Sequence, residues 1–121
     1  MTTKKVLFVQ YPKCSTCRKA KKWLEEHNIE FESRHIVENN PQSDEIKEWW
    51  EKSDLPLKRF FNTSGMKYRE LKLKDKLPDM SEEEQLDLLA TDGMLVKRPV
   101  VVGDDFVLVG FKQKEWEEIL L

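Results

Sequence analysis

The two cysteines of this chain, Cys14 and Cys17, lie three residues apart in the stretch from Tyr11 to Arg18, which reads Tyr-Pro-Lys-Cys-Ser-Thr-Cys-Arg. A thiolate is a strong nucleophile, and a second thiol at this spacing can attack the mixed disulfide that the first one forms. The spacing therefore predicts thiol–disulfide chemistry, with Cys14 as the nucleophile, Cys17 as the resolving thiol and a Cys14–Cys17 disulfide as the product.

The segments around the cysteines predict how they are placed. Residues 5–10 are apolar and rich in β-formers, which indicates a buried strand. A helix is expected to begin at Cys14 or Ser15 and to end near Asn28, with a second strand over residues 31–37. These elements form a βαβ unit, and a C-x-x-C pair that opens its helix is typical of redox proteins.

The start of that helix should make Cys14 reactive. Unpaired backbone N–H groups and the positive end of the helix dipole favour an anion there. Lys13 and Arg18 add positive charge. We therefore expect the pKa of Cys14 to lie below the ordinary thiol value of about 8.5.

Two other interpretations of the cysteines are weaker. The pair could serve as small core residues, but Cys14 lies in a polar and cationic segment. A zinc site would need His27 and His35, and the spacing C-x2-C-x9-H-x7-H does not match a compact zinc finger. We expect no metal ion.

The rest of the chain predicts an all-helical insertion at about residues 41–93 and then a second half of two strands and a helix. A capping box at Ser81 and Glu84 starts a helix inside the insertion. Two short strands, at 99–102 and 106–109, form a hairpin, and a last helix covers 113–120. We expect one α/β domain over residues 1–121.

Composition narrows the class of protein further. The 121 residues carry a formal charge of −2, and 36% of them are charged with both signs interspersed, which disfavours direct binding to nucleic acid or to a membrane surface. The N-terminus is short and polar, and no apolar run approaches membrane-spanning length. A cytoplasmic protein is the expectation, and in that compartment two such cysteines favour catalysis over a structural disulfide.

The order of elements, with C-x-x-C at the first helix, resembles the thioredoxin superfamily. Members of that superfamily carry a cis-proline that faces the cysteines at the start of their third strand, and Pro99 occupies this place. The resemblance implies a thioredoxin-like fold with a four-stranded mixed sheet. It also implies that Arg98, the residue before Pro99, faces the same pocket.

The combination of Cys14, Arg18 and the Arg98-Pro99 pair is similar to the glutaredoxin-linked arsenate reductase family and its Spx-type relatives. In that family the first cysteine attacks the oxyanion while arginines stabilise the oxyanion and the thiolate. The resemblance implies an enzyme in which Cys14, Cys17, Arg18 and Arg98 are catalytic. The segments around them would bind the substrate, through Lys13, Ser15, Thr16 and Pro99.

The same resemblance implies no bound cofactor, with electrons supplied by glutathione or by a glutaredoxin or thioredoxin. Two arginines of those enzymes have no counterpart here, one in the region of residues 62–65 and one near Gly110; Arg59 and Arg69 are only neighbours in the sequence. The alternative is an Spx-type, redox-switched transcription regulator. Such a regulator would bind the C-terminal domain of the RNA polymerase α subunit.

Overall fold

A four-stranded mixed sheet organises the molecule, and the computed structural model describes residues 5–121 of it. The strand order is β2-β1-β3-β4. Strand β1 (Val6–Gln10) pairs in parallel with β2 (Phe31–His35) and antiparallel with β3 (Val100–Val102), and β3 pairs antiparallel with β4 (Val107–Val109). The α/β fold expected from the sequence, with its four-stranded mixed sheet, is confirmed.

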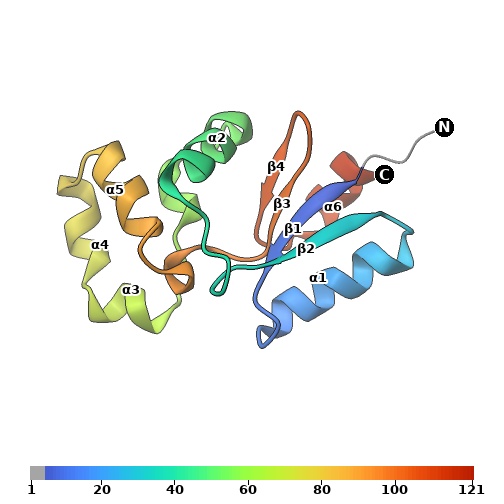
Figure 1. Ribbon diagram of the computed structural model, residues 1–121, viewed down its shortest axis with the longest axis horizontal. Coiled ribbons are helices and arrows are strands. Elements are labelled where there is room, and N and C mark those ends of the chain that lie inside the picture. Colours follow the sequence, from blue (N-terminus) through green and yellow to red (C-terminus); the bar gives the residue numbers. More distant parts are fainter. Residues whose placement is uncertain (1–4) are drawn as a thin grey trace.

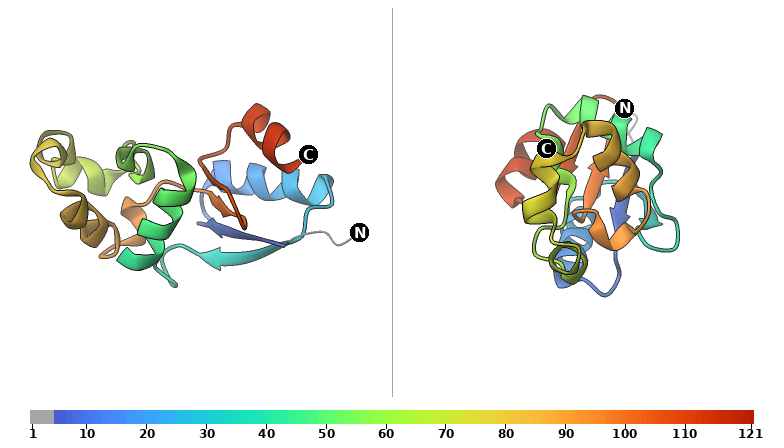
Figure 2. Two further views of the ribbon diagram at one scale, coloured as in Figure 1. Left: turned by 90° about the horizontal axis from the view of Figure 1, so that it is seen from above. Right: turned by 90° about the vertical axis from the view of Figure 1, so that its left-hand side faces the viewer.

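Helices cover both faces of the sheet, as Figures 1 and 2 show. Helix α1 (Ser15–Glu26) and helix α6 (Gln113–Leu120) lie on one face. Because neighbouring residues of a strand point to opposite faces, each strand supplies side chains to both layers of the core. The α1 and α6 side buries Val6, Phe8, Ala20, Trp23, Leu24, Val101, Leu108 and Trp116.

Helix α2 (Ser43–Ser53) packs on the opposite face, where its Ile46 and Trp49 belong to the same buried cluster as Val100 and Val107 of the hairpin. Strand β2 is joined to this helix by a bidentate ion pair. The two guanidinium nitrogens of Arg34 lie 2.7 and 2.9 Å from the carboxylate oxygens of Glu45. Such forked pairs fix orientation as well as distance, so the ion pair ties the sheet edge to the segment that follows it.

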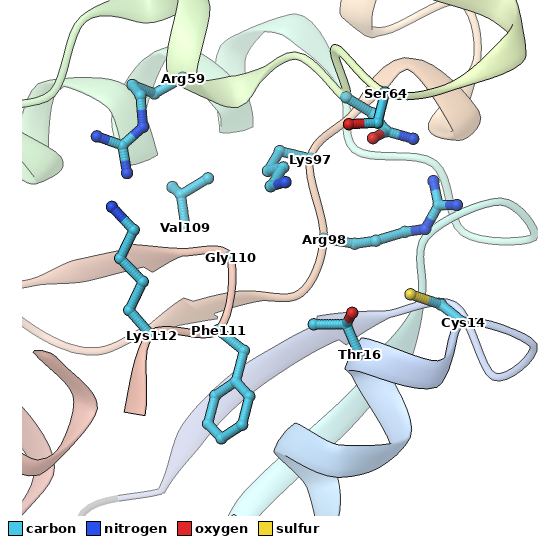
Figure 3. Close-up of a pocket in the computed structure, with 11 residues that line it drawn as sticks. Cys14, Thr16, Arg59, Ser64, Lys97, Arg98, Val109, Gly110, Phe111 and Lys112 are labelled. Atoms are coloured by element: carbon cyan, nitrogen blue, oxygen red, sulfur yellow. The ribbon is translucent and has the colours of Figure 1, made fainter. Parts of the chain in front are cut away.

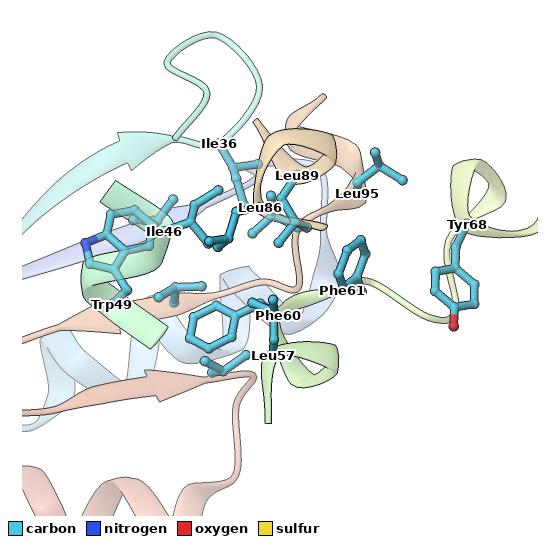
Figure 4. Packing of buried hydrophobic residues seen from close by; sticks show 14 of the residues in the cluster. Ile36, Ile46, Trp49, Leu57, Phe60, Phe61, Tyr68, Leu86, Leu89 and Leu95 are labelled. Carbon is cyan, nitrogen blue, oxygen red and sulfur yellow. The ribbon is translucent and has the colours of Figure 1, made fainter. Parts of the chain in front are cut away.

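The segment between β2 and β3 is helical beyond α2 as well, as predicted. It contains η1 (Leu57–Phe60), α3 (Met66–Glu70), α4 (Leu73–Lys76), η2 (Leu77–Asp79), α5 (Glu82–Leu89) and η3 (Gly93–Leu95). Its apolar side chains continue the core beyond the end of the sheet, as Figure 4 shows.

Two local details of the insertion follow from its sequence. The capping box expected before α5 is present, since the Ser81 hydroxyl accepts from the Glu84 N–H at 3.1 Å and the Glu84 carboxylate accepts from the Ser81 N–H at 2.8 Å. Residues 66–76 form two short helices, α3 and α4, and not one. Lys72 adopts a left-handed conformation, with φ of 54°, and this interrupts the helix.

None of the helices within residues 5–121 is long and apolar enough to cross a membrane.

Gly93 packs against the backbone that directly follows β2, and its substitution should destabilise the fold. A Cβ at Gly93 would lie 2.0 Å from the carbonyl oxygen of Ile36, which is backbone and cannot rotate away. We expect Gly93→Ala to lower the free energy of unfolding by about 2 kcal/mol or more, measured by urea denaturation. Gly65→Ala is the control, because its closest contact is the end of the Asn62 side chain. Equal stability of the two variants would contradict this account.

Candidate active site

Cys14 and Cys17 occupy opposite environments at the start of α1. Cys14 is the N-cap residue, in an extended conformation, and its side chain makes no capping hydrogen bond. Its backbone N–H donates to the Tyr11 carbonyl at 2.9 Å, which closes the turn between β1 and α1. Cys17 lies one turn further on the buried face of the helix and is 0% exposed, whereas Cys14 is half-buried. Both are free thiols in the structure.

The two thiols also differ in acidity. Burial raises the pKa of Cys14, but the Cys17 backbone N–H, the Cys17 thiol, the Arg98 guanidinium and the Thr16 N–H together lower it below the ordinary value. Burial is the main cause that raises the pKa of Cys17 to about 12, and the neighbouring Cys14 adds to it. As the pH rises, Cys14 is therefore the thiol that loses its proton first, while Cys17 keeps its proton at neutral pH.

Arg98 is the cation next to the Cys14 sulfur, and it reaches this place from the start of β3. The Arg98–Pro99 peptide bond is cis, as the resemblance implied. The guanidinium carbon lies 5.2 Å from the centroid of the Tyr11 ring, and the Tyr11 ring in turn contacts His35 edge to face at 5.7 Å. The Arg98 atoms Nε and Nη1 are buried and have no hydrogen-bond partner within residues 5–121. Since a buried cationic donor without an acceptor is costly, this arrangement favours an anion beside Cys14.

A cavity of about 450 Å³ opens beside the Cys14 sulfur, as Figure 3 shows. Four of the side chains that line it are cationic, and none of these lining residues is acidic. The full lining consists of Cys14, Thr16, Arg59, Asn62, Ser64, Lys97, Arg98, Val109, Gly110, Phe111 and Lys112. The cavity is thus built to hold a negatively charged molecule against a reactive sulfur.

The backbone explains how the insertion reaches this cavity. Phe61 and Val96 form an isolated antiparallel bridge. The Lys97 N–H donates to the Phe60 carbonyl at 2.8 Å, and the Asn62 N–H donates to the Leu95 carbonyl at 2.7 Å. These bonds hold η1 and the residues that follow it against the segment that leads into β3. They therefore bring Arg59 to the end of the cavity away from Arg98, as Figure 3 shows.

The other wall of the cavity is the turn from β4 to α6. Gly110 has a φ of 79°, a conformation that favours glycine. Its N–H donates to the Pro99 carbonyl at 2.8 Å, and its carbonyl accepts from the Trp116 indole at 3.1 Å. Lys97 lies over this residue, since a Cβ at Gly110 would be 3.4 Å from the Lys97 Cε. The turn from β4 to α6 is thus held by hydrogen bonds to Pro99 and to Trp116.

The residues proposed from the sequence separate into three groups. Cys14, Thr16 and Arg98 line the cavity. Cys17 and Pro99 are buried and are not among its lining residues. The remaining three are exposed and lie outside the lining: Lys13, Ser15 and Arg18. The guanidinium of Arg18 is directed to the Pro12 carbonyl, at 3.4 Å.

Three cationic residues of the cavity were not proposed as site residues. Lys97 directly precedes Arg98 in the sequence, and this position beside a predicted site residue is the one feature of the sequence that could have indicated its place in the cavity. Lys112 follows Gly110 by two residues, next to the place where an arginine of the related enzymes is missing. Arg59 was interpreted as a mere neighbour of the region of residues 62–65, and this interpretation is wrong because Arg59 lines the cavity. In the described part of the chain, no group of three or more side chains of the metal-binding types is clustered.

The molecule has a thioredoxin-like fold with a cysteine pair at the start of its first helix and a cis-proline before its third strand, and these features define its class. The sequence narrows the class to one family. Residues 9–119 match the ArsC family, and the chain belongs to that family.

Among relatives of known sequence, one is named as uncharacterized and another as a regulatory protein. A Bacillus subtilis (strain 168) protein called "Uncharacterized protein YusI" is 62% identical over 111 residues, which is 92% of this chain and 94% of that protein. "Regulatory protein MgsR" of the same organism is 31% identical over 108 residues, 89% of this chain and 84% of that protein. The family thus includes proteins named as regulators.

Solved structures resemble the whole molecule. A "putative ArsC family related protein from Bacteroides fragilis" has a TM-score of 0.93 and 62% identity, and the match covers 97% of this chain and 98% of that one. A "possible arsenate reductase from Streptococcus mutans UA159" has a TM-score of 0.85 and 43% identity, with 94% and 98% covered.

The role of Arg98 in Cys14 acidity can be tested by substitution. Arg98→Gln should raise the pKa of Cys14, because the guanidinium that favours the thiolate is lost. The rate of alkylation by iodoacetamide should then reach its half-maximal value at a higher pH than in the wild type. Arg18→Gln, which removes the same charge from outside the cavity, should leave this midpoint unchanged. A larger shift for Arg18→Gln than for Arg98→Gln would contradict the assignment.

Proposed function

We propose that the protein is a cytoplasmic thiol–disulfide oxidoreductase with Cys14 as the nucleophile and Cys17 as the resolving thiol. The observation that carries the proposal is the pairing of a thiol of lowered pKa with a buried, protonated thiol one helical turn away. Arg98 favours the anionic sulfur, and the cavity beside it gives access to a substrate.

The reaction has two steps. The Cys14 thiolate attacks one sulfur of a substrate disulfide, so that a Cys14–substrate bond forms and the other half leaves as a thiolate. Cys17 then loses its proton and attacks the Cys14 sulfur, which releases the second half as a thiolate. The substrate gains two electrons and the cysteine pair becomes a disulfide. Two equivalents of an external thiol, from glutathione or from a glutaredoxin or thioredoxin, would return the pair to the reduced state.

Because the Cys17 thiol is a weak acid, the second step, in which Cys17 attacks the Cys14 sulfur, is the slow one. Formation of the mixed disulfide removes the negative charge of Cys14, but burial, the main cause of the raised pKa of Cys17, remains. Far below that pKa, the fraction of Cys17 present as thiolate increases about tenfold for each pH unit. Closure of the intramolecular disulfide should therefore accelerate with pH, and a small external thiol competes with it at neutral pH.

Oxyanion reduction by the same sulfur is the family-specific form of this activity. From the sequence alone, the groups expected to bind the oxyanion are Arg18, Arg98 and the N-terminus of the first helix. The cavity instead offers Arg59, Lys97, Arg98 and Lys112, and several charge-assisted donors are what a divalent oxyanion needs when it leaves water. Turnover with arsenate and with a model disulfide, measured in parallel, separates the two substrates.

The roles of the two thiols give distinct expectations for their variants. Cys14→Ser should reduce reaction with a disulfide probe to the background rate, because the nucleophile is lost. Cys17→Ser should react once and accumulate a mixed disulfide at Cys14, detected by intact-protein mass spectrometry. In the wild type, the rate of closure should rise about tenfold per pH unit between pH 7 and 9. A pH-independent closure, or full reactivity of Cys14→Ser, would refute the mechanism.

A redox-switched regulator is the second candidate, because the chain is 31% identical to a protein named as regulatory. In this case formation of the Cys14–Cys17 disulfide would alter the start of α1 and with it a binding surface. The expected partner is the C-terminal domain of the RNA polymerase α subunit. A pull-down with that domain should retain one redox form of the protein about tenfold better than the other, the size of an ordinary allosteric coupling. Absence of binding in both forms removes this candidate.

A further inference from the structure

The side chain of Tyr11 lies between the ends of two neighbouring strands, directly after β1. Strand β1 pairs in parallel with β2, which ends at His35. On its other side β1 runs antiparallel to β3, with Val9 opposite Val100. When this register is continued past the end of β1, Tyr11 falls opposite Arg98. The residue that follows β1 is thus flanked by His35 on one side and by Arg98 on the other, and it contacts both.

Within residues 5–121, no protein oxygen holds the Arg98 guanidinium in place. The side chain forms no ion pair there, and its Nε and Nη1 atoms have no hydrogen-bond partner. Figure 3 nevertheless shows it extended toward the Cys14 sulfur. An arginine side chain loses much conformational freedom when it is confined to one position. The contact that can offset this loss is the Tyr11 ring, whose centroid lies 5.2 Å from the guanidinium carbon.

The Tyr11 ring is itself held by the turn after β1 and by the end of β2. The Tyr11 carbonyl accepts from the Cys14 N–H at 2.9 Å, and the proline that follows confines Tyr11 to extended conformations. The His35 ring contacts the Tyr11 ring edge to face, with 5.7 Å between centroids and an angle of 88° between planes. The His35 ring is fixed in turn, because its Nδ1 accepts from two backbone N–H groups at 3.1 and 3.2 Å. The guanidinium therefore meets a ring of fixed orientation.

The aromatic face is the part of Tyr11 that can act on Arg98. Such a face attracts a cation through its quadrupole and uses none of the cation's hydrogen-bond donors. The Tyr11 hydroxyl makes no hydrogen bond in the described part of the chain. A phenylalanine ring at this place should therefore serve as well, whereas an aliphatic side chain of similar size should not.

We propose that Tyr11 is a positioning residue whose ring holds the Arg98 guanidinium beside the Cys14 sulfur. Tyr11 is not among the residues that line the cavity, so its side chain acts on the thiol through Arg98. This role rests on the proposed function, in which Cys14 is the nucleophile, and adds the residue that keeps its cation in place. It concerns the reactivity of the sulfur and not the binding of a substrate.

The test is the pH dependence of Cys14 alkylation by iodoacetamide. Tyr11→Leu should move the midpoint of the rate profile upward by about 0.5 pH unit or more, which is about a threefold smaller thiolate fraction below the midpoint. Tyr11→Phe should stay within about 0.2 pH unit of the wild type, because it keeps the ring. In the Arg98→Gln background Tyr11→Leu should cause no further shift, since the cation that the ring holds is gone.

Phe106→Leu is the matched control for the loss of an aromatic ring. Phe106 packs partly buried on the α1 and α6 side of the sheet and is not among the residues that line the cavity. Its substitution should lower the free energy of unfolding and leave the alkylation midpoint unchanged. Equal midpoint shifts for Phe106→Leu and Tyr11→Leu would overturn the proposal, because the midpoint would then follow stability. A Tyr11→Leu shift that persists in full in the Arg98→Gln background would overturn it as well.

A measurement on the wild type covers the case in which Tyr11→Leu does not fold. An aromatic ring shifts the NMR signals of protons above its face upfield. The side-chain proton signals of Arg98 should therefore lie upfield of those of Arg18, which is exposed. Tyr11→Phe should preserve this upfield shift. Arg98 signals at the same positions as those of Arg18 would reject the contact and the positioning role with it.

The positioning role and the proposed function can fail separately. If the wild type reacts with no disulfide but Tyr11→Leu moves the alkylation midpoint as expected, the redox function is rejected and the positioning role is supported. If disulfide reduction is normal but Tyr11→Leu leaves the midpoint in place, the positioning role is rejected and the redox function is supported.

Discussion

The electrostatic contact between the Cys14 sulfur and the Arg98 guanidinium is the interaction on which the chemistry of this molecule depends. Half-burial alone would make the thiol a weaker acid. The first turn of α1 and Arg98 reverse that effect and lower the Cys14 pKa. Arg98 can do so because the Tyr11 ring, and not a carboxylate, lies beneath its guanidinium. A carboxylate there would neutralise the cation, whereas the ring holds it and leaves its donors available.

The difference between the two cysteines arises from helix periodicity. Cys17 shares the buried face of α1 with Ala20, Trp23 and Leu24, so its thiol lies in the core and keeps its proton. Cys14 precedes the first turn and faces the cavity. A spacing of three residues therefore places one sulfur in a polar, cationic environment and the other in an apolar one. The division of labour between nucleophile and resolving thiol follows from this difference.

The sequence predicts the parts of this site that are local and leaves out those that depend on tertiary contacts. The position of Cys14 at a helix start follows from the strand, the turn and the apolar face of the helix. The cis bond before Pro99 required the resemblance to a known superfamily, since proline alone rarely adopts it. The side chain of Arg18 could not be placed, because an exposed arginine near a helix start can turn toward the thiolate or toward a carbonyl such as that of Pro12. Arg59 reaches the cavity only through the bridge between Phe61 and Val96, a pairing with no local signature.

The bridge between Phe61 and Val96 joins two parts of the chain that supply different residues to the cavity. One strand of it continues into Lys97 and Arg98, and the other belongs to the helical insertion that carries Arg59, Asn62 and Ser64. The reactive sulfur belongs to neither strand of the bridge. Changes of sequence in residues 59–64 can therefore alter which molecules are admitted while the sulfur and its acidity stay the same. In this architecture, selectivity evolves separately from reactivity, which is consistent with one family containing proteins named both as reductases and as regulators.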